Sequence, residues 1–106
     1  MTSQLSLLYT TFATEEEAIS ISKELLQRHM IGCVNILGKV RSLYFWDQEL
    51  QDKQEISVLF KTTSEKMSEL IEALNDLHPY EVPMILEIPI TRANSNFVAW
   101  VQEAVI

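Results

Sequence analysis

The residues best suited to chemistry lie in the segment His78–Pro83, His-Pro-Tyr-Glu-Val-Pro, which carries one of the two histidines and two of the three prolines. A neutral imidazole is a common metal ligand and an acid–base group near pH 7. Proline fixes its own φ and holds the preceding residue extended, so His78 and Val82 are expected outside any helix. Such a stiff connector can present the imidazole near Tyr80 and Glu81 in fixed positions. An ordinary helix-to-strand turn, with His78 bonded to a backbone carbonyl, explains the same segment, so the motif alone leaves both interpretations open.

Further candidates lie on two segments that are expected to be strands. Glu55 and Lys61 share one face of a strand but lie six residues apart, about 20 Å along it, so they cannot pair within it. They either line a cleft, pair across a subunit boundary, or are exposed charges flanking an apolar strand. Tyr44 and Trp46 share one strand face and form an aromatic ladder. Such ladders are typical of sheet or interface packing, and a stacking platform for a ligand is the alternative.

Cys33 is the single cysteine and a candidate ligand for a soft metal. Its apolar strand setting is more typical of a buried, inert thiol. One cysteine with His29 and His78 cannot form the usual closed zinc patterns. The chain also lacks a glycine-rich phosphate loop, a nucleophile elbow and a paired-acid motif, so the sequence predicts neither an enzyme nor an organic cofactor.

The size and charge of the chain narrow its class. Its 106 residues predict a single domain, residues 1–106. A net charge of -7 and a pI near 4.7 argue against a nucleic-acid or anionic-membrane partner, because both would be repelled. A lone cysteine suits a reducing compartment, and no apolar run approaches the ~20 residues of a membrane-spanning helix. The N-terminus lacks a signal-peptide pattern, so a cytoplasmic protein is expected.

Hydrophobic periodicity predicts an alternation of strands and helices. The expected elements, in chain order, are a strand over 5–12, a helix from Thr14 to about residue 30, a strand over 33–37 that bends at Gly38 and continues over 40–46, a polar hairpin connection over 47–49, a strand over 55–61, a helix after Thr62, a strand over 84–90 and a short helix capped by Asn94 or Ser95. Pro89 is expected at a strand end or on an edge, because it cannot donate to a ladder.

The two long helices carry start signals and apolar stripes. Capping boxes pair Thr14 with Glu17 and Thr62 with Glu65. The apolar stripes are formed by Ala18, Ile21, Leu25 and Leu26 in the first helix and by Met67, Leu70, Ile71 and Leu74 in the second. Each stripe is expected to face the sheet.

The order β-α-β-β-α-β with a trailing helix is the signature of an α+β, ferredoxin-like split-βαβ sandwich. Two helices cover one face of such a sheet and leave the other face exposed to solvent. The second and third strands nevertheless carry apolar residues on both faces, over 40–46 and 55–61. An uncovered apolar face and a long unpaired strand edge promote aggregation. The apolar residues on both faces of these strands therefore predict that copies of the chain associate.

A set of residues spread over the whole chain resembles the CutA (CutA1) divalent-cation tolerance proteins: Ser42-x-Tyr44-x-Trp46, Glu55, Lys61-Thr62, His78-Pro79-Tyr80-Glu81-x-Pro83 and Trp100. The resemblance implies a ferredoxin-like fold assembled as a tight homotrimer, with an architecture similar to that of PII signalling proteins. It also implies a cytoplasmic location and association with divalent metals, particularly copper.

The resemblance further implies a site in clefts between subunits. Residues matching Glu55, Lys61 and His78, with the aromatic Tyr44 and Trp46, gather around these clefts, and Tyr80 and Glu81 lie on the segment that forms one side. The implied metal ligands are His78, Glu55 and Cys33. Some members implicated in copper binding carry a cysteine where this chain has Tyr9. Because a phenol is a harder ligand than a thiolate, Cu(II) is expected in preference to Cu(I).

Three functions remain in competition. The preferred one is a metal-binding homotrimer involved in cation tolerance, with His78 and Glu55 as ligands. The second is a PII-like signalling or small-ligand-sensing trimer, in which Lys61 binds an anion and Tyr44 and Trp46 stack on the ligand. The third is a structural scaffold trimer whose polar cluster only sets the register of the subunits.

Overall fold

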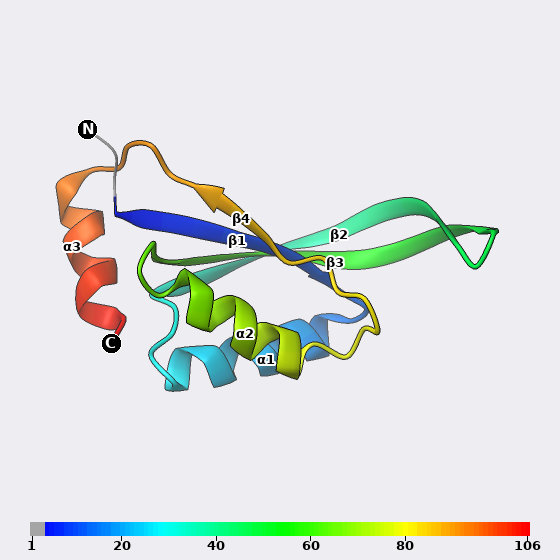
Figure 1. Ribbon diagram of the computed structural model, residues 1–106, viewed down its shortest axis with the longest axis horizontal. Coiled ribbons are helices and arrows are strands. Elements are labelled where there is room, and N and C mark those ends of the chain that lie inside the picture. Colours follow the sequence, from blue (N-terminus) through cyan, green and yellow to red (C-terminus); the bar gives the residue numbers. More distant parts are fainter. Residues whose placement is uncertain (1–3) are drawn as a thin grey trace.

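The computed structural model describes residues 4–106, which form one sheet and three helices in this part of the chain (Figure 1). The elements in order are β1 (Leu5–Phe12), α1 (Glu15–Gln27), β2 (Cys33–Trp46), β3 (Glu49–Thr63), α2 (Met67–Leu77), β4 (Leu86–Pro89) and α3 (Ser95–Ala104). The described chain is elongated, with extents of 46 × 28 × 22 Å. None of these helices is long and apolar enough to cross a membrane.

The sheet has the strand order β2-β3-β1-β4, and every neighbouring pair is antiparallel. This order inserts β3 between β1 and β2 and inserts β1 between β3 and β4, which is the split βαβ arrangement. Helices α1 and α2 lie together against one face (Figure 1). The predicted α+β, ferredoxin-like class is therefore confirmed.

The predicted start of α1 is confirmed. The Thr14 Oγ1 accepts a hydrogen bond from the Glu17 backbone N–H at 3.1 Å, which satisfies one of the free donors at the helix start. The predicted apolar stripe is wrong at one position, because Leu26 is exposed and Ser22 is buried instead. The helix ends at Gln27, slightly before the expected end.

The second predicted capping box is wrong. β3 continues through Thr63, and Thr62 lies inside it, fully buried, with its hydroxyl donating to the Met30 carbonyl oxygen at 2.7 Å. The helix begins later, at Met67, and its N-cap residue Lys66 makes no side-chain capping bond. Thr62 lies in the strand because its backbone pairs in the ladder there and its buried hydroxyl finds a hydrogen-bond acceptor in the Met30 carbonyl.

The hairpin β2–β3 is longer than its sequence pattern predicted. β3 begins at Glu49 rather than at residue 55, because polar residues continue the ladder where no helix covers it. The predicted irregularity at Gly38 is confirmed: the register shifts between Ile36 and Gly38, and Gly38 has a φ of 104°. This left-handed conformation is one that glycine adopts without strain.

The last strand is shorter than the predicted 84–90. β4 comprises Leu86–Pro89 and pairs only with the stretch 6–9 of β1. Pro89 ends this strand at the edge of the sheet, as predicted. Asn94 is the N-cap residue of α3, although its side chain makes no capping bond.

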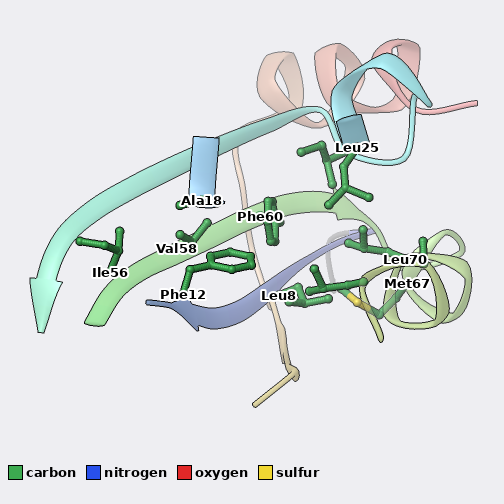
Figure 2. Packing of buried hydrophobic residues seen from close by; sticks show 12 residues of the cluster. Leu8, Phe12, Ala18, Leu25, Ile56, Val58, Phe60, Met67 and Leu70 are labelled. Carbon is green, nitrogen blue, oxygen red and sulfur yellow. The ribbon is translucent and has the colours of Figure 1, made fainter. Parts of the chain in front are cut away.

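The core lies between the helices and the covered face of the sheet (Figure 2). Its fully buried members include Leu8, Phe12, Val58, Phe60, Leu25, Leu70 and Leu74. At the end of the sheet, α3 packs its buried Val101 against Gly32. A Cβ on Gly32 would lie 3.0 Å from the Val101 Cγ1, so a larger residue there would force the Val101 side chain to shift.

Candidate functional site

His78 lies at the point where α2 ends. Its backbone is extended, with φ −70° and ψ 130°, and its N–H donates to the Leu74 carbonyl oxygen at 2.8 Å. Pro79 accounts for this geometry, because it disfavours the helical conformation of the residue before it. The imidazole is buried and stacks on the Phe12 ring, with the ring centroids 4.6 Å apart. The segment after α2 thus returns to the end of β1.

Both ring nitrogens of His78 have partners. Nε2 lies 2.8 Å from the Thr11 carbonyl oxygen, and the Tyr80 backbone N–H donates to Nδ1 at 3.2 Å. Because a carbonyl only accepts and a backbone N–H only donates, the proton of the neutral ring is on Nε2 and the lone pair is on Nδ1. The bond to a backbone carbonyl, one of the two alternatives that the sequence left open, is present in the structure.

Burial lowers the pKa of His78 below its ordinary value, against the opposing effects of the Thr11 carbonyl and of the carboxylates Glu17 and Glu55. The neutral imidazole therefore predominates at pH 7. A neutral ring whose Nε2–H is anchored to a carbonyl presents one nitrogen lone pair in a fixed direction.

Glu55 lies on β3, opposite Val40 of β2, and only 8% of it is exposed. Its Oε2 accepts hydrogen bonds from the Tyr80 hydroxyl at 2.7 Å and from the Thr11 hydroxyl at 3.0 Å. Burial by itself raises the pKa of Glu55, but hydrogen bonds from Ser42, Tyr80 and Thr11, together with the nearby His78, outweigh burial and lower it. The carboxylate is therefore ionised at pH 7.

Glu55 has no cationic partner among residues 4–106. The ion pairs in this part of the chain join Arg28 to Glu24, Arg41 to Asp52 and Lys66 to Glu69, all near the surface. The hydroxyl groups of Ser42, Tyr80 and Thr11, with the nearby His78, stabilise the buried charge of Glu55. Unpaired buried carboxylates are uncommon in proteins, because removing such a charge from water is costly.

Tyr80 connects His78 to Glu55. Its ring meets the His78 ring edge-on, with the ring centroids 4.7 Å apart, and its hydroxyl reaches the Glu55 carboxylate. Burial, followed by the hydrogen bond to Glu55, raises the pKa of Tyr80 above its ordinary value, so the phenol keeps its proton. The structure thus brings His78, Tyr80 and Glu55 together, as three of the predicted site residues.

Two predicted site residues lie elsewhere. Cys33 and Lys61 stand opposite each other in the β2–β3 register, at the end of the ladder remote from Glu55. The Lys61 Nζ lies over the Phe97 ring of α3, 5.5 Å from the ring centroid. Within one chain, neither Cys33 nor Lys61 joins the cluster around Glu55.

Tyr44, Trp46 and Glu81 are exposed. Tyr44 and Trp46 lie on the part of the hairpin that projects beyond the helices, opposite Gln51 and Glu49 respectively (Figure 1). Tyr44 makes a minor contribution to the raised pKa of Tyr80.

Sequence reasoning missed the roles of Thr11 and Ser42. Both hydroxyls act on Glu55, yet each lies in a strand whose pattern reads as ordinary alternation. No sequence signal marked Thr11, whose burial is visible only in the structure. In residues 4–106, no group of three or more His, Cys, Asp or Glu side chains is arranged to hold a metal ion.

Comparison with known proteins agrees with the fold. The family model of the CutA1 divalent ion tolerance protein matches residues 6–104. The divalent-cation tolerance protein CutA of Thermotoga maritima is 39% identical over 100 residues, covering 94% of this chain and 98% of that protein. The protein of the same name from Thermus thermophilus is 38% identical over 93 residues, covering 88% and 90%.

Solved structures agree as well. The crystal structure of the divalent ion tolerance protein CutA1 from Ehrlichia chaffeensis superposes with a TM-score of 0.92 at 36% identity, covering 98% of this chain and 97% of that one. CutA1 from Pyrococcus horikoshii gives a TM-score of 0.91 at 33% identity, covering 95% and 98%. The fold and site thus define an α+β protein of the ferredoxin-like class. The chain belongs to the CutA1 divalent ion tolerance family.

Proposed function

We propose that this protein acts in divalent-cation tolerance as a homotrimer that binds divalent cations, with Cu(II) preferred, at the cluster around Glu55. The observation that carries the proposal is the Glu55 carboxylate itself, which is buried, ionised and without a cationic partner among the described residues. A bound cation supplies the charge that the hydroxyl groups cannot. The family's association with divalent-cation tolerance agrees with this chemistry.

His78 suits the role of a second ligand. Metal-ligating histidines commonly donate their other N–H to a carbonyl or carboxylate, and the Nε2 of His78 is bonded to the Thr11 carbonyl in this way. Coordination through Nδ1 replaces only the 3.2 Å bond from the Tyr80 N–H. Imidazole and carboxylate together suit Cu(II), whereas no thiolate lies near them to favour Cu(I).

The remaining ligands come from outside this set of residues. Because the described chain holds no group of three or more suitable side chains, a full coordination sphere requires water or another copy of the chain. Cys33, the third predicted ligand, stands at the far end of the ladder and reaches such a site only from a neighbouring subunit.

The exposed apolar surface supports the homotrimer. The hairpin leaves Leu43, Phe45 and Leu50 more than half exposed, and Leu86 and Ile88 are exposed on β4. Isolated exposed apolar residues are ordinary, but two apolar areas on one small sheet favour burial between copies. The negative net charge and the single cysteine, as argued above, favour a cytoplasmic protein without nucleic-acid or membrane partners.

Lys61 bears on the alternative of a small-ligand sensor. Its ammonium group lies over the Phe97 ring, away from Tyr44 and Trp46, so one chain does not place the proposed anion-binding and stacking groups together. A sensor site would therefore need Lys61 from a neighbouring subunit, as the metal site would need Cys33.

Titration of the purified protein with Cu(II) by isothermal calorimetry tests the proposal. We expect Glu55→Gln to weaken binding by at least about tenfold, because removal even of outer-shell partners has effects of this size. The matched control is Glu87→Gln, which alters another carboxylate that accepts a hydroxyl hydrogen bond, from Ser6, but is exposed. Equal affinity of the wild type and Glu55→Gln would refute the proposed site.

A further inference from the structure

The hydrogen bonds to Glu55 are distributed unevenly over its two oxygens. The Tyr80 and Thr11 hydroxyls both donate to Oε2, at 2.7 and 3.0 Å. An ionised carboxylate has about four acceptor positions, two on each oxygen. The two donors therefore fill Oε2. Ser42 supplies the third hydroxyl that faces the carboxylate, so the remaining acceptor position is on Oε1.

We propose that Tyr80, assisted by Thr11, is a specificity-determining residue that restricts Glu55 to one-oxygen coordination of a cation. This inference rests on the proposed function, because it assumes that Glu55 binds a cation. With Oε2 occupied, Glu55 offers Oε1 alone. Cations that need only one carboxylate oxygen can bind, whereas binding of cations that prefer to coordinate both oxygens is weakened.

The chemistry of the cations makes this restriction selective. Ca²⁺ collects six to eight oxygen ligands and often takes both oxygens of one carboxylate. Cu(II) favours nitrogen and oxygen ligands in a tetragonal arrangement, to which a carboxylate contributes through one atom. Hydroxyl groups that occupy the second oxygen therefore weaken the binding of Ca²⁺, while the first oxygen is still available to bind Cu(II).

The contacts of Tyr80 hold its hydroxyl in place on Oε2 of Glu55. Its hydroxyl bond to an ionised acceptor is short, and bonds of this kind are about twice as strong as neutral ones. The ring is held edge-on against His78, with the ring centroids 4.7 Å apart. Thr11 donates to the same oxygen from a buried strand position.

Measuring Cu(II) and Ca²⁺ affinities of the wild type, Tyr80→Phe and Thr11→Val by calorimetry tests the inference. Tyr80→Phe keeps the ring and frees one acceptor position of Oε2. We expect the ratio of Cu(II) to Ca²⁺ affinity to fall roughly tenfold, which corresponds to the loss of one hydrogen bond to a charged group. Thr11→Val should lower the ratio in the same direction. The control Thr62→Val removes a buried hydroxyl that bonds to Met30, and should leave the ratio unchanged.

Infrared spectroscopy supplies a readout independent of affinity. The separation between the asymmetric and symmetric carboxylate stretches narrows when a carboxylate binds a cation through both oxygens. Difference spectra against Glu55→Gln isolate the Glu55 band. We expect a wide separation in the wild type with either ion and a narrow one in Tyr80→Phe with Ca²⁺. An unchanged separation and an unchanged affinity ratio in Tyr80→Phe would overturn the inference.

The two proposals fail in different ways. If Glu55→Gln binds Cu(II) as tightly as the wild type, the cation site is wrong and the role of Tyr80 falls with it. If Glu55→Gln loses binding while Tyr80→Phe keeps the wild-type ratio, the cation site stands and only the role of Tyr80 is overturned.

Discussion

The environment of Glu55 consists of side chains that lie far from it in the sequence. Thr11 is 44 residues away, Tyr80 is 25 residues away, and both donate to the same carboxylate oxygen. Together with Ser42 and the nearby His78, they outweigh the cost of burial and keep the carboxylate charged. At the scale of residues, the ionisation of Glu55 therefore depends mainly on hydroxyl groups and not on Lys61.

Not every buried hydroxyl is used in this way. The Thr10 Oγ1 is fully buried on β1 and has no hydrogen-bond partner within the described chain, so it lacks compensation for its lost hydration. We expect Thr10→Val to raise the free energy of unfolding by about 1 kcal/mol, because the new methyl group has no hydration to lose. Chemical denaturation of the two proteins measures the difference.

Thr62 provides the matched comparison for Thr10. It is equally buried, but its hydroxyl donates to the Met30 carbonyl oxygen at 2.7 Å. Thr62→Val should therefore lower the free energy of unfolding by about 1 kcal/mol, since it removes this hydrogen bond to the Met30 carbonyl. Equal effects of the two substitutions would contradict this account.

At the scale of elements, the hairpin β2–β3 is the most distinctive feature of the fold. It projects beyond the helices (Figure 1). It closes through a two-residue turn in which Asp47 and Gln48 both have positive φ, 51° and 66°. Two-residue hairpin turns of this type match the twist of the strands, and glycine follows Asp or Asn in their preferred sequences. Gln48 is therefore a strained choice at its position.

Gln48→Gly should raise the free energy of unfolding by about 0.5–1 kcal/mol, because glycine adopts a left-handed conformation without steric cost. Thermal unfolding followed by circular dichroism measures the change. Gln51→Gly, a few residues along β3 in extended backbone, is the control and should be destabilising by about the same amount. A destabilised Gln48→Gly would show that the side chain of Gln48 has a role that the turn geometry does not reveal.

At the scale of the whole molecule, the sheet presents one face without helices. Leu8 faces the core, so the alternation of a strand turns Tyr9 and its neighbour Leu86 to the opposite face. Tyr9 is half-buried there, whereas Leu86 is 49% exposed. We propose this face as part of the contact between copies in the proposed homotrimer, because Leu86 and Ile88 of β4 are exposed on it.

Leu86→Glu tests the contact. We expect the wild type to sediment at about three times the chain mass of 12.2 kDa. The variant should shift towards a single chain, because a charge buried between copies without a partner is costly. Analytical ultracentrifugation measures the masses. Ile19→Glu, an exposed position on α1, is the control and should keep the wild-type mass. A variant that assembles normally would exclude this face from the contact.

The order and type of the elements were predictable from the sequence, because they depend on local patterns. A short run rich in apolar and β-branched residues placed β1, and the capping box placed the start of α1 at Thr14. The same capping signal misled at Thr62, because β3 extended past the predicted boundary and the Met30 carbonyl took the hydroxyl. A local rule cannot detect an acceptor 32 residues away.

The residues of the site show the same difference between what local sequence patterns predict and what long-range packing decides. The sequence by itself determined that His78, Tyr80 and Glu55 are candidates, since prolines, a phenol and a carboxylate are visible in any linear reading. Only the tertiary structure decided that Thr11 and Ser42 join them, and that Cys33 and Lys61 do not within one chain. The reason is physical: register and strand order set which side chains meet across a sheet. Both depend on packing between segments far apart in the chain.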